Sequence, residues 1–425
     1  MVCMSGTDHP ADARLLAEAA ARHSYGKLVA FLAARSGDVA AAEDALAEAF
    51  ATALVRWPQD GPPANPEAWL LTVARRKLID DLRRRRGEEG ADALETVAAS
   101  LTDAAEAGEI PDRRLALLFT CAHPAVDASV RAPLMLQVVI GLDAARIASA
   151  FLIAPSAMSQ RLVRAKAKIR QAGIPFRIPE RTELAGRLEA VLDAIYAAFS
   201  EGWMDAAGTD VARRDLAEEA IYLCRLVTEL LPGEPETLGL LALMLYAEAR
   251  RAARRGTGGE YIPLAEQSTD LWDRNKIEQA EQALRRAVAM GRIGRYQLEA
   301  AIQSAHVERH KTGRANWPQV VELYDALVEL TGSPVAALNR SLAVAEVSGA
   351  EAALACLAEI STDARATEYQ PYWAARAELL SRTRAKADAL HAYDVAIGME
   401  RDPSVRQFLE AKRAGVIARQ NGAIP

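Results

Sequence analysis

The sequence predicts an all-α protein. Alanine, leucine and other aliphatic residues dominate its apolar stretches, while aromatic residues make up only 5% of the 425 residues. Alanine and leucine have high helix propensities, and the long apolar runs lack the β-branched alternation that is typical of strands. Hydrophobic residues account for 51% of the chain, which is enough for two or three domains with cores of their own.

The residues favour a cytoplasmic protein that does not contact a membrane. The N-terminus has no charged start followed by an apolar run, and the longest apolar stretches fall short of the roughly 18 residues of a membrane span. Cys3, Cys121, Cys224 and Cys356 are widely scattered and show no CxxC spacing. We therefore expect reduced thiols and neither a metal site nor a disulfide framework.

Charge is distributed by segment, although the formal net charge is -6. Residues 1–86 contain 12 Lys/Arg and 11 Asp/Glu, residues 87–112 contain 8 acids and no base, and residues 113–181 contain 11 bases and 3 acids. The remaining residues are mildly acidic, with 28 bases against 35 acids. Two basic segments on either side of an acidic strip indicate nucleic-acid binding in the N-terminal half.

The first basic segment predicts a helix over residues 66–86 that begins at Asn65 and Pro66. Its stretch VARRKLIDDLRRRR places seven cations in fourteen positions. One stripe is apolar and consists of Leu71, Ala74, Leu78 and Leu82. Trp69 shares a side with Arg76 and Arg83. This combination suits single-stranded nucleic acid, because the cations can bind its backbone and the ring can stack on an unpaired base. The alternative is a solvated helix end with a half-buried tryptophan.

The preceding stretch, VAAAEDALAEAFATALVRWP, predicts another amphipathic helix. Its apolar stripe consists of Leu46, Phe50, Ala53 and Trp57. Asp44 and Glu48 lie one turn apart on the opposite side, either as ordinary solvent surface or as a docking site for a basic helix. The loop PQDGPPANP separates the two helices, because its prolines preclude a continuous helix.

AEDALAEAF, the loop and AWLLTVARRKLIDDLRRRR together closely resemble region 2 of extracytoplasmic-function (ECF) sigma factors, the promoter-recognition subunits of bacterial RNA polymerase. The resemblance implies a region 2 domain over residues 10–86. It implies contacts with core polymerase at Glu43, Asp44 and Glu48. It implies contacts with the melted -10 strand at Asn65, Trp69, Arg75, Arg76, Lys77, Arg83 and Arg84.

The second basic segment, residues 141–170, predicts a helix-turn-helix. A short helix around Asp143–Ala150 precedes a second helix that opens at Pro155, with the Ser156 hydroxyl as its cap. The inward positions of the second helix are Met158, Leu162, Ala165 and Ile169. Its outward side chains can reach base edges in a major groove, with cations beside the phosphates on both flanks. The alternative is an ordinary helical hairpin with a basic solvent face.

This segment, including RLVRAK, resembles region 4 of the same sigma factors, which reads the -35 element. The resemblance implies a region 4 domain over residues 113–176, joined to region 2 by an acidic linker over residues 87–112. It implies contacts with -35 DNA at Ser156, Ser159, Gln160, Arg161, Arg164, Lys166 and Lys168.

The C-terminal half predicts an irregular helical domain over residues 182–294 and degenerate tetratricopeptide (TPR)-like repeats over residues 295–416. The packing positions of the TPR template are filled by Trp373, Ala377, Leu380, Ala389, Tyr393 and Ala396. Concave faces of such arrays hold peptides or helices, so we expect a protein or peptide partner there. We find no catalytic constellation, metal site or cofactor motif: His306 and His310 lack the adjacent glutamate of a zinc protease.

The order of these segments, with TCAHPA and LLALMLYAEARR, resembles ECF sigma factors that have a C-terminal TPR-like domain. The resemblance implies a protein that is not an enzyme, binds core RNA polymerase and promoter DNA, and is regulated by its C-terminal domain. Two alternatives stay open. One is a conventional helix-turn-helix regulator with a TPR-like sensing domain, and the other is a TPR scaffold with incidental basic patches.

Overall fold

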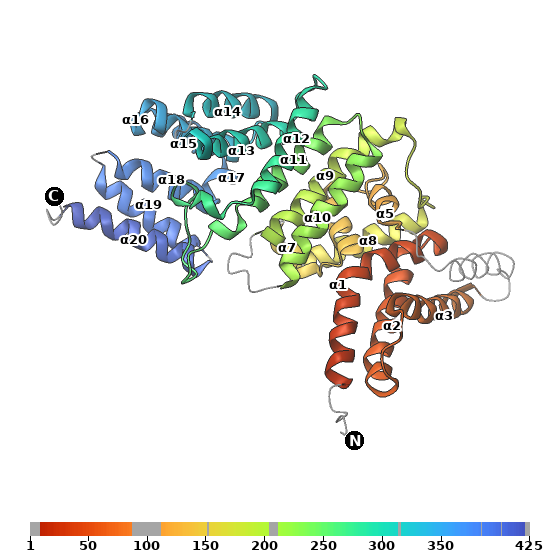
Figure 1. Ribbon diagram of the computed structural model, residues 1–425. Helices are drawn as coiled ribbons and strands as arrows, with labels where there is room; N and C mark the ends of the chain where they lie inside the picture. The colour runs from red at the N-terminus through yellow and green to blue at the C-terminus, as the bar shows by residue number, and fades with distance from the viewer. Residues whose placement is uncertain are drawn as a thin grey trace. The chain divides into compact units, whose positions relative to one another are not determined.

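The computed structural model confirms the all-α prediction and describes residues 9–86, 112–150, 153–203, 211–312, 316–383, 385–400 and 402–420 (Figure 1). In these ranges the only β-type pairing is an isolated bridge between Arg255 and Tyr261. The chain divides into two compact units, Met1–Met204 with Asp210–Leu226, and Asp205–Thr209 with Val227–Pro425. The acidic linker expected over residues 87–112 lies outside the described residues, except for Asp112.

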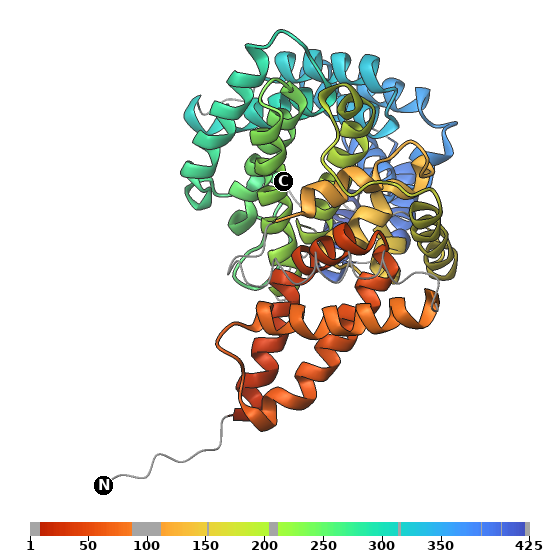
Figure 2. The same cartoon turned by 90° about the vertical axis from the view of Figure 1, so that its right-hand side faces the viewer.

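Three helices begin the first unit: α1 (His9–Ser36), α2 (Val39–Asp60) and α3 (Pro66–Arg86). Helices α1 and α2 lie side by side and α3 crosses them (Figure 2). Asp38 caps α2 by accepting a hydrogen bond from the backbone N–H of Ala41, and Asn65 caps α3 in the same way through Ala68. The helix predicted over residues 66–86 is therefore confirmed, together with its start.

The apolar stripes predicted for α2 and α3 form the core of these three helices. Fully buried members are Leu46, Ala53 and Trp57 of α2 and Leu71, Ala74 and Leu78 of α3. Phe50 is half-buried, and the side chain of Leu82 lies outside the described part of the structure. Helix α1 adds the buried Leu28, Phe31 and Leu32. Each large apolar side chain that is buried contributes roughly 1.5–3 kcal/mol, so this core holds α3 on the α1–α2 pair.

The first unit continues with short helices that lead to a basic one. These are α5 (Arg114–Cys121), α6 (Ala128–Met135), η2 (Leu136–Ile140), α7 (Ala144–Ala150) and α8 (Pro155–Gln171). The π-helical segment η2 extends α6 and ends at Gly141, whose φ of 83° is in the left-handed region that favours glycine. Helices α7 and α8 pack against each other. The prediction that Ser156 caps α8 is wrong: Ala154 is the N-cap residue, without a side-chain hydrogen bond, because the helix already begins at Pro155.

Helix α9 (Arg181–Trp203) and most of α10 (Val211–Leu230) also belong to the first unit. Helix α9 packs on α5, α6 and η2, and the Arg187 guanidinium donates a hydrogen bond to the Phe119 carbonyl. The buried Arg114 at the start of α5 pairs with Glu219 of α10. Because of these contacts, the division between units falls within α10, whereas the sequence placed a domain limit at residues 176–182.

The second unit is a succession of helices, most of which pack on a neighbour along the chain. Its helices are α11 (Pro235–Ala249), η3 (Arg251–Ala253), η4 (Leu264–Glu266), η5 (Thr269–Leu271), α12 (Arg274–Val288), α13 (Arg295–Thr312), α14 (Trp317–Thr331), α15 (Pro334–Ser348), α16 (Ala350–Glu359), α17 (Ala364–Thr367), α18 (Gln370–Ser381), α19 (Lys386–Met399) and α20 (Pro403–Gln420). The six residues that fit the TPR packing template all lie in one apolar cluster of α18, α19 and α20.

A close approach joins α11 to the start of α13 in the second unit. A Cβ atom on Gly239 would lie 2.7 Å from the backbone nitrogen of Gln297, so a side chain at this position has no room. One turn earlier, the Glu236 carboxylate accepts hydrogen bonds from the backbone N–H groups of Tyr296 and Gln297 at 2.9 and 3.2 Å. These bonds satisfy donors that the first turn of α13 leaves unpaired.

The change Gly239→Ala is predicted to lower the free energy of unfolding of the second unit by about 1–3 kcal/mol, because the added methyl group must displace backbone atoms of α13. The matched control is Gly398→Ala in α19, where a Cβ atom meets nothing within 4 Å. There the same change should raise stability by roughly 0.5–1 kcal/mol through helix propensity. Thermal denaturation followed by circular dichroism measures both; equal shifts of Tm would contradict the close packing.

Candidate nucleic-acid interface

The outward side of α3 is basic. Arg76, Arg83 and Arg84 are exposed. Arg84 pairs with Asp81, and Arg83 lies 3.9 Å from Asp80. Arg76 forms no ion pair with any residue that the structure describes, which leaves its guanidinium open to an anionic ligand. Arg75 is half-buried instead. This burial is the main reason why the pKa of its guanidinium is lowered, and the nearby positive charge of Arg76 lowers the pKa further.

Trp69 combines a structural contact with partial exposure. Its ring lies 5.4 Å from that of the buried Trp57, centroid to centroid, with an interplanar angle of 67°. This edge-to-face geometry is favourable for aromatic pairs. Trp69 itself is half-buried, so the structure combines the two sequence readings: one side of the indole packs on the core and the rest reaches the surface beside the cations of α3.

Asn65 and Lys77, also predicted to bind DNA, already have partners. The Asn65 side-chain oxygen caps α3 at 3.1 Å from the Ala68 nitrogen, which leaves its amide nitrogen to reach a ligand. The Lys77 ammonium lies 2.5 Å from a carboxylate oxygen of Glu48 on α2. Hydrogen bonding to Glu48 raises the pKa of Lys77. A ligand that takes Lys77 must therefore compete with an intramolecular ion pair.

The three carboxylates predicted to contact polymerase have different surroundings on α2. Asp44 and Glu48 are exposed. Glu43 instead points toward α8, where one of its oxygens lies 2.8 Å from the Lys166 ammonium. Its other oxygen accepts a hydrogen bond from the Tyr25 hydroxyl at 3.3 Å. The predicted set is thus divided between an exposed pair and one carboxylate inside the first unit.

Helix α8 has the buried stripe that the sequence predicts. Its buried residues are Met158, Leu162, Ala165 and Ile169. The exposed residues include Ser156, Ser159, Gln160, Arg161, Val163, Arg164 and Lys168. Val163 exposes 60% of its surface although it is apolar, so a methyl-bearing side chain lies in the middle of a polar face. Such a face offers donors, acceptors and an apolar contact to base edges.

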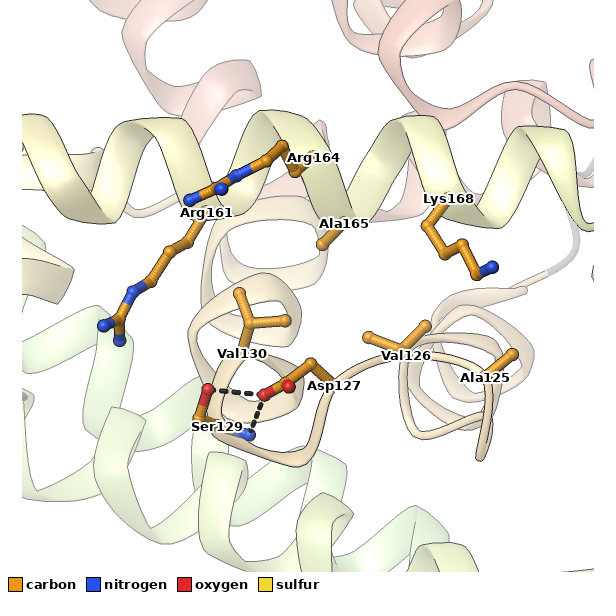
Figure 3. A pocket seen from close by; sticks show the side chains of 9 residues that line it. All are labelled: Ala125, Val126, Asp127, Ser129, Val130, Arg161, Arg164, Ala165 and Lys168. Atoms are coloured by element: carbon orange, nitrogen blue, oxygen red, sulfur yellow. Dashed lines mark hydrogen bonds between the residues drawn. The ribbon is translucent and has the colours of Figure 1, made fainter.

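A pocket of about 430 Å³ lies beside this face, between α8 and the segment that leads into α6 (Figure 3). Arg161, Arg164 and Lys168 line it from α8. None of these three cations forms an ion pair within 4 Å in the described part of the chain. The opposite wall carries Asp127, whose carboxylate caps α6 by accepting hydrogen bonds from the Ser129 backbone N–H and hydroxyl at 2.8 and 2.5 Å.

The pocket is therefore positive and partly apolar. It holds three cations against one carboxylate, and the hydrogen bonds from Ser129 lower the pKa of Asp127, which stays ionised as a cap. Its floor consists of the apolar Val126, Val130 and Ala165. Unpaired guanidinium and ammonium groups in a concave surface favour an anion, and a phosphate group suits the forked geometry of arginine best.

The remaining cations of α8 lie on its other flank and are paired. Lys166 contacts Glu43, and the Arg170 guanidinium lies 3.2 Å from the Asp38 carboxylate of α2. Lys166 is therefore placed apart from the other predicted DNA-binding residues of α8. Sequence analysis missed Tyr25, Asp38 and Arg170 in this contact. One signal was present: Lys166 and Arg170 are four residues apart and so share a side of the helix.

Comparisons with known proteins agree with the basic face of α3. Residues 21–88 match the family model of sigma-70 region 2, which spans most of α1, α2 and α3. Residues 187–288 match a family of unknown function (DUF6596). No solved structure matches the chain. The region 2 match supports a sigma-70 family factor, with a role in promoter recognition and RNA polymerase binding.

The chain is also 37% identical, over 374 residues, to the "Uncharacterized protein R00370" of Rhizobium meliloti (strain 1021). The alignment covers 87% of this chain and 88% of that protein. The chain therefore belongs to the same family as R00370. Two further observations concern the described residues alone: they contain no cluster of three or more His, Cys, Asp or Glu side chains that could hold a metal ion, and none of their helices has the length and hydropathy to cross a bilayer.

Replacing Trp69 is predicted to separate its two roles. Trp69→Ala should lower the free energy of unfolding by about 2 kcal/mol, because the edge contact with Trp57 and part of the core are lost. Trp69→Phe should cost less than about 1 kcal/mol, since a smaller ring keeps the contact. Leu54→Ala on α2 is the control, because this side chain is 51% exposed and its truncation should change the free energy of unfolding little. Urea denaturation measures all three, and an Ala variant as stable as the control would show that the ring has no structural role.

Proposed function

We propose that the chain is an ECF-type sigma factor that binds core RNA polymerase in the cytoplasm of a bacterium and directs it to promoters with defined -10 and -35 elements. The match of residues 21–88 to sigma-70 region 2 carries the proposal. The exposed chemistry of that region supports it, because a basic helix with a half-exposed indole is suited to an unpaired strand. The chain itself contributes recognition, and catalysis belongs to the polymerase, so no cofactor or metal is required.

In this proposal α3 holds the melted -10 strand. Arg76, Arg83 and Arg84 attract the phosphates, with Arg75 behind them, while the exposed part of Trp69 stacks on a base. The amide nitrogen of Asn65 and the ammonium of Lys77 donate to the same strand. Lys77 is released from Glu48 as it does so, and this exchange keeps its ammonium group paired before and after binding.

Helix α8, in a helix-turn-helix with α7, reads the -35 duplex in the major groove. Ser156, Ser159, Gln160 and Val163 face the base edges, and the cations of the pocket between α8 and α6, Arg161, Arg164 and Lys168, each contact a backbone phosphate. The charge of the pocket supports this assignment of roles, since exposed cations without an ion-pair partner can hold phosphates and fix the register of a helix on duplex DNA without reading sequence.

The exposed acidic side of α2 docks the polymerase. Asp44 and Glu48 lie one turn apart on this side, where the exposed Leu54 and Val55 follow them. Carboxylates that flank exposed apolar side chains form a surface that complements a basic, amphipathic helix. Glu43 belongs to the same helix but is engaged by Lys166 in the free chain.

The C-terminal unit regulates this activity and binds a protein or peptide partner through its TPR-like helices. The single apolar cluster formed by the template residues of α18 and α19 supports the repeat assignment. A test by truncation must keep α9 and α10, because Arg187 and Glu219 hold them on the first unit. A chain that ends near Leu230 is therefore the informative one, and promoter output equal to that of the full chain would rule out regulation.

Purified chain mixed with bacterial core polymerase and a library of promoter fragments is predicted to yield transcripts that share one -35 and -10 pair. Arg76→Ala and Arg83→Ala should each reduce these transcripts roughly tenfold, because each removes a cation from the -10 strand. Arg286→Ala, an exposed cation on α12 in the other unit, serves as the control and should have no effect. Run-off transcription measures all of them.

The contrary outcome has a definite meaning. Sequence-specific duplex binding through α8 without any binding to core polymerase would identify a conventional helix-turn-helix regulator. Duplex binding that shows neither sequence preference nor salt dependence would instead identify a helical scaffold with incidental basic patches.

Removing one pocket cation is predicted to change the salt dependence of duplex binding. Arg161→Ala, Arg164→Ala and Lys168→Ala should each lower the slope of log K against log salt by about 0.9, the value for one phosphate contact. Gln160→Ala, on the outward face of the same helix, should change sequence preference and leave the slope intact. Fluorescence anisotropy at four salt concentrations measures the slopes. Equal slopes for the pocket variants and the unsubstituted protein would exclude the pocket as a phosphate site.

A further inference from the structure

One buried arginine of the second unit has no acidic partner. Among the described residues the buried arginines are Arg114, Arg187 and Arg250, each of which is 8% exposed. Arg114 pairs with Glu219. Arg187 lies 3.8 Å from a carboxylate oxygen of Glu183. Arg250, at the end of α11, forms no ion pair with any residue that the structure describes. A buried guanidinium without a carboxylate is costly, because its charge has lost solvating water and gained no counter-charge.

The hydrogen bonds of Arg250 leave donors unused. Its Nε donates to the Tyr246 carbonyl of α11, and its Nη2 donates to the side-chain oxygen of Gln303 on α13 at 2.6 Å. Its Nη1 donates no hydrogen bond to a described residue. Because a guanidinium accepts no hydrogen bond, the amide oxygen of Gln303 must face it, and the amide nitrogen is a second unused donor beside it. Two neighbouring N–H groups without an acceptor favour a ligand that presents oxygens.

Two carboxylates beside the same segment already bind other arginines. Arg251, the next residue along the chain, lies 2.8 Å from a carboxylate oxygen of Glu248. Arg255 lies 2.5 Å from a carboxylate oxygen of Asp402, just before α20. Both of these ion pairs are mostly shielded from solvent, with side chains that are between 8% and 31% exposed. Neither carboxylate can therefore neutralise Arg250 unless an existing ion pair is broken.

The charge that acts on Arg250 has the same sign as its own. Arg254 follows the short helix η3 and is half-buried. Burial is the main reason why the pKa of Arg250 is lowered to about 10, and the positive charge of Arg254 lowers it further. The pKa of Arg254 is also lowered to about 10, mainly because of burial. Both groups stay ionised at neutral pH, and two adjacent cations in surroundings of low polarity attract a dianion more strongly than a monoanion.

We propose that Arg250, Arg254 and Gln303 form a binding site for a phosphate group, carried by a small phosphorylated molecule or by a phosphorylated side chain. A phosphate group has a charge of about -1.5 to -2 at pH 7 and three acceptor oxygens. It can therefore neutralise both guanidinium groups and accept hydrogen bonds from the unused donors of Arg250 and Gln303. The half-buried Gln303 and Arg254 connect the site to solvent. The inference goes beyond the proposed function, and its test needs neither polymerase nor DNA.

Hydrogen exchange of the full chain, read by mass spectrometry with and without inorganic phosphate at matched ionic strength, tests the site. Phosphate at about ten times its dissociation constant should slow exchange about tenfold in residues 250–262 and in α13 around Gln303, because it lowers the population of locally open states by that factor. The readout must be local, since the pocket beside α8 is also proposed to contact phosphates. Unchanged exchange in both segments, whatever happens in α8, overturns the proposal.

Other anions test the chemical class and the source of the phosphate. Acetate at the same ionic strength should slow exchange much less than phosphate, because it has a single charge. Equal slowing by the two anions overturns the assignment to phosphate. Glycerol phosphate and a phosphoserine pentapeptide then distinguish the two sources. Slowing by glycerol phosphate alone identifies a small phosphorylated molecule, and slowing by the pentapeptide but not by its unphosphorylated form identifies a phosphorylated side chain.

Three variants connect the effect to these residues. Gln303→Glu places a carboxylate where an oxygen already lies 2.6 Å from Arg250. It should raise Tm in phosphate-free buffer by about 3 °C and abolish the effect of phosphate on exchange. Arg250→Gln should also abolish that effect, whereas Arg286→Gln, which removes an exposed cation of α12, should keep it. A lower Tm for Gln303→Glu would show that the charge of Arg250 is already compensated, which contradicts the proposal.

Discussion

The first unit depends on the close approach of α1 to η2. At Gly26 the two backbones are too near for any side chain, and the contact is possible because residue 26 has no Cβ atom. Since α1 packs along α2 and η2 leads directly into the α7–α8 pair, this one approach brings α2 beside α8. The ion pairs of Glu43 and Asp38 follow from it, because they need the two helices in place before their side chains can meet.

The cations of the first unit fall into two groups, those with an ion-pair partner and those without one. Lys166 and Arg170 are neutralised by α2, and Lys77 by Glu48, whereas Arg76 on α3 and the three pocket cations of α8 form no ion pair with a described residue. Buried or half-buried pairs contribute to the arrangement of helices, and exposed unpaired cations contribute little to stability. This division indicates where an anionic partner can bind without breaking an existing contact, and the region 2 match supports promoter DNA as the proposed partner.

Local patterns were sufficient to predict α2, α3, α7 and α8 and much of the core that α2 and α3 form. Periodicity and the Asn65–Pro66 start predicted α3, and the inward stripe of α8 agrees residue by residue with its buried positions. Contacts between distant segments were not predictable in the same way. The pairing of Lys166 with Glu43 and the packing of α9 on α6 depend on how helices meet in space, which helical periodicity does not encode. Ser156 failed as a cap because two adjacent start signals competed and Pro155 took the first helical position.

The most direct measurement of the central claim is the affinity of the full chain for core RNA polymerase in the absence of DNA. Surface-immobilised polymerase should bind the chain saturably, and Asp44→Lys should weaken this binding at least tenfold, because it reverses an exposed charge on the acidic side of α2. Arg286→Ala on α12 should leave it unchanged. Absence of saturable binding, or equal binding by the Asp44→Lys variant, would contradict the account of α2 as the polymerase-docking helix.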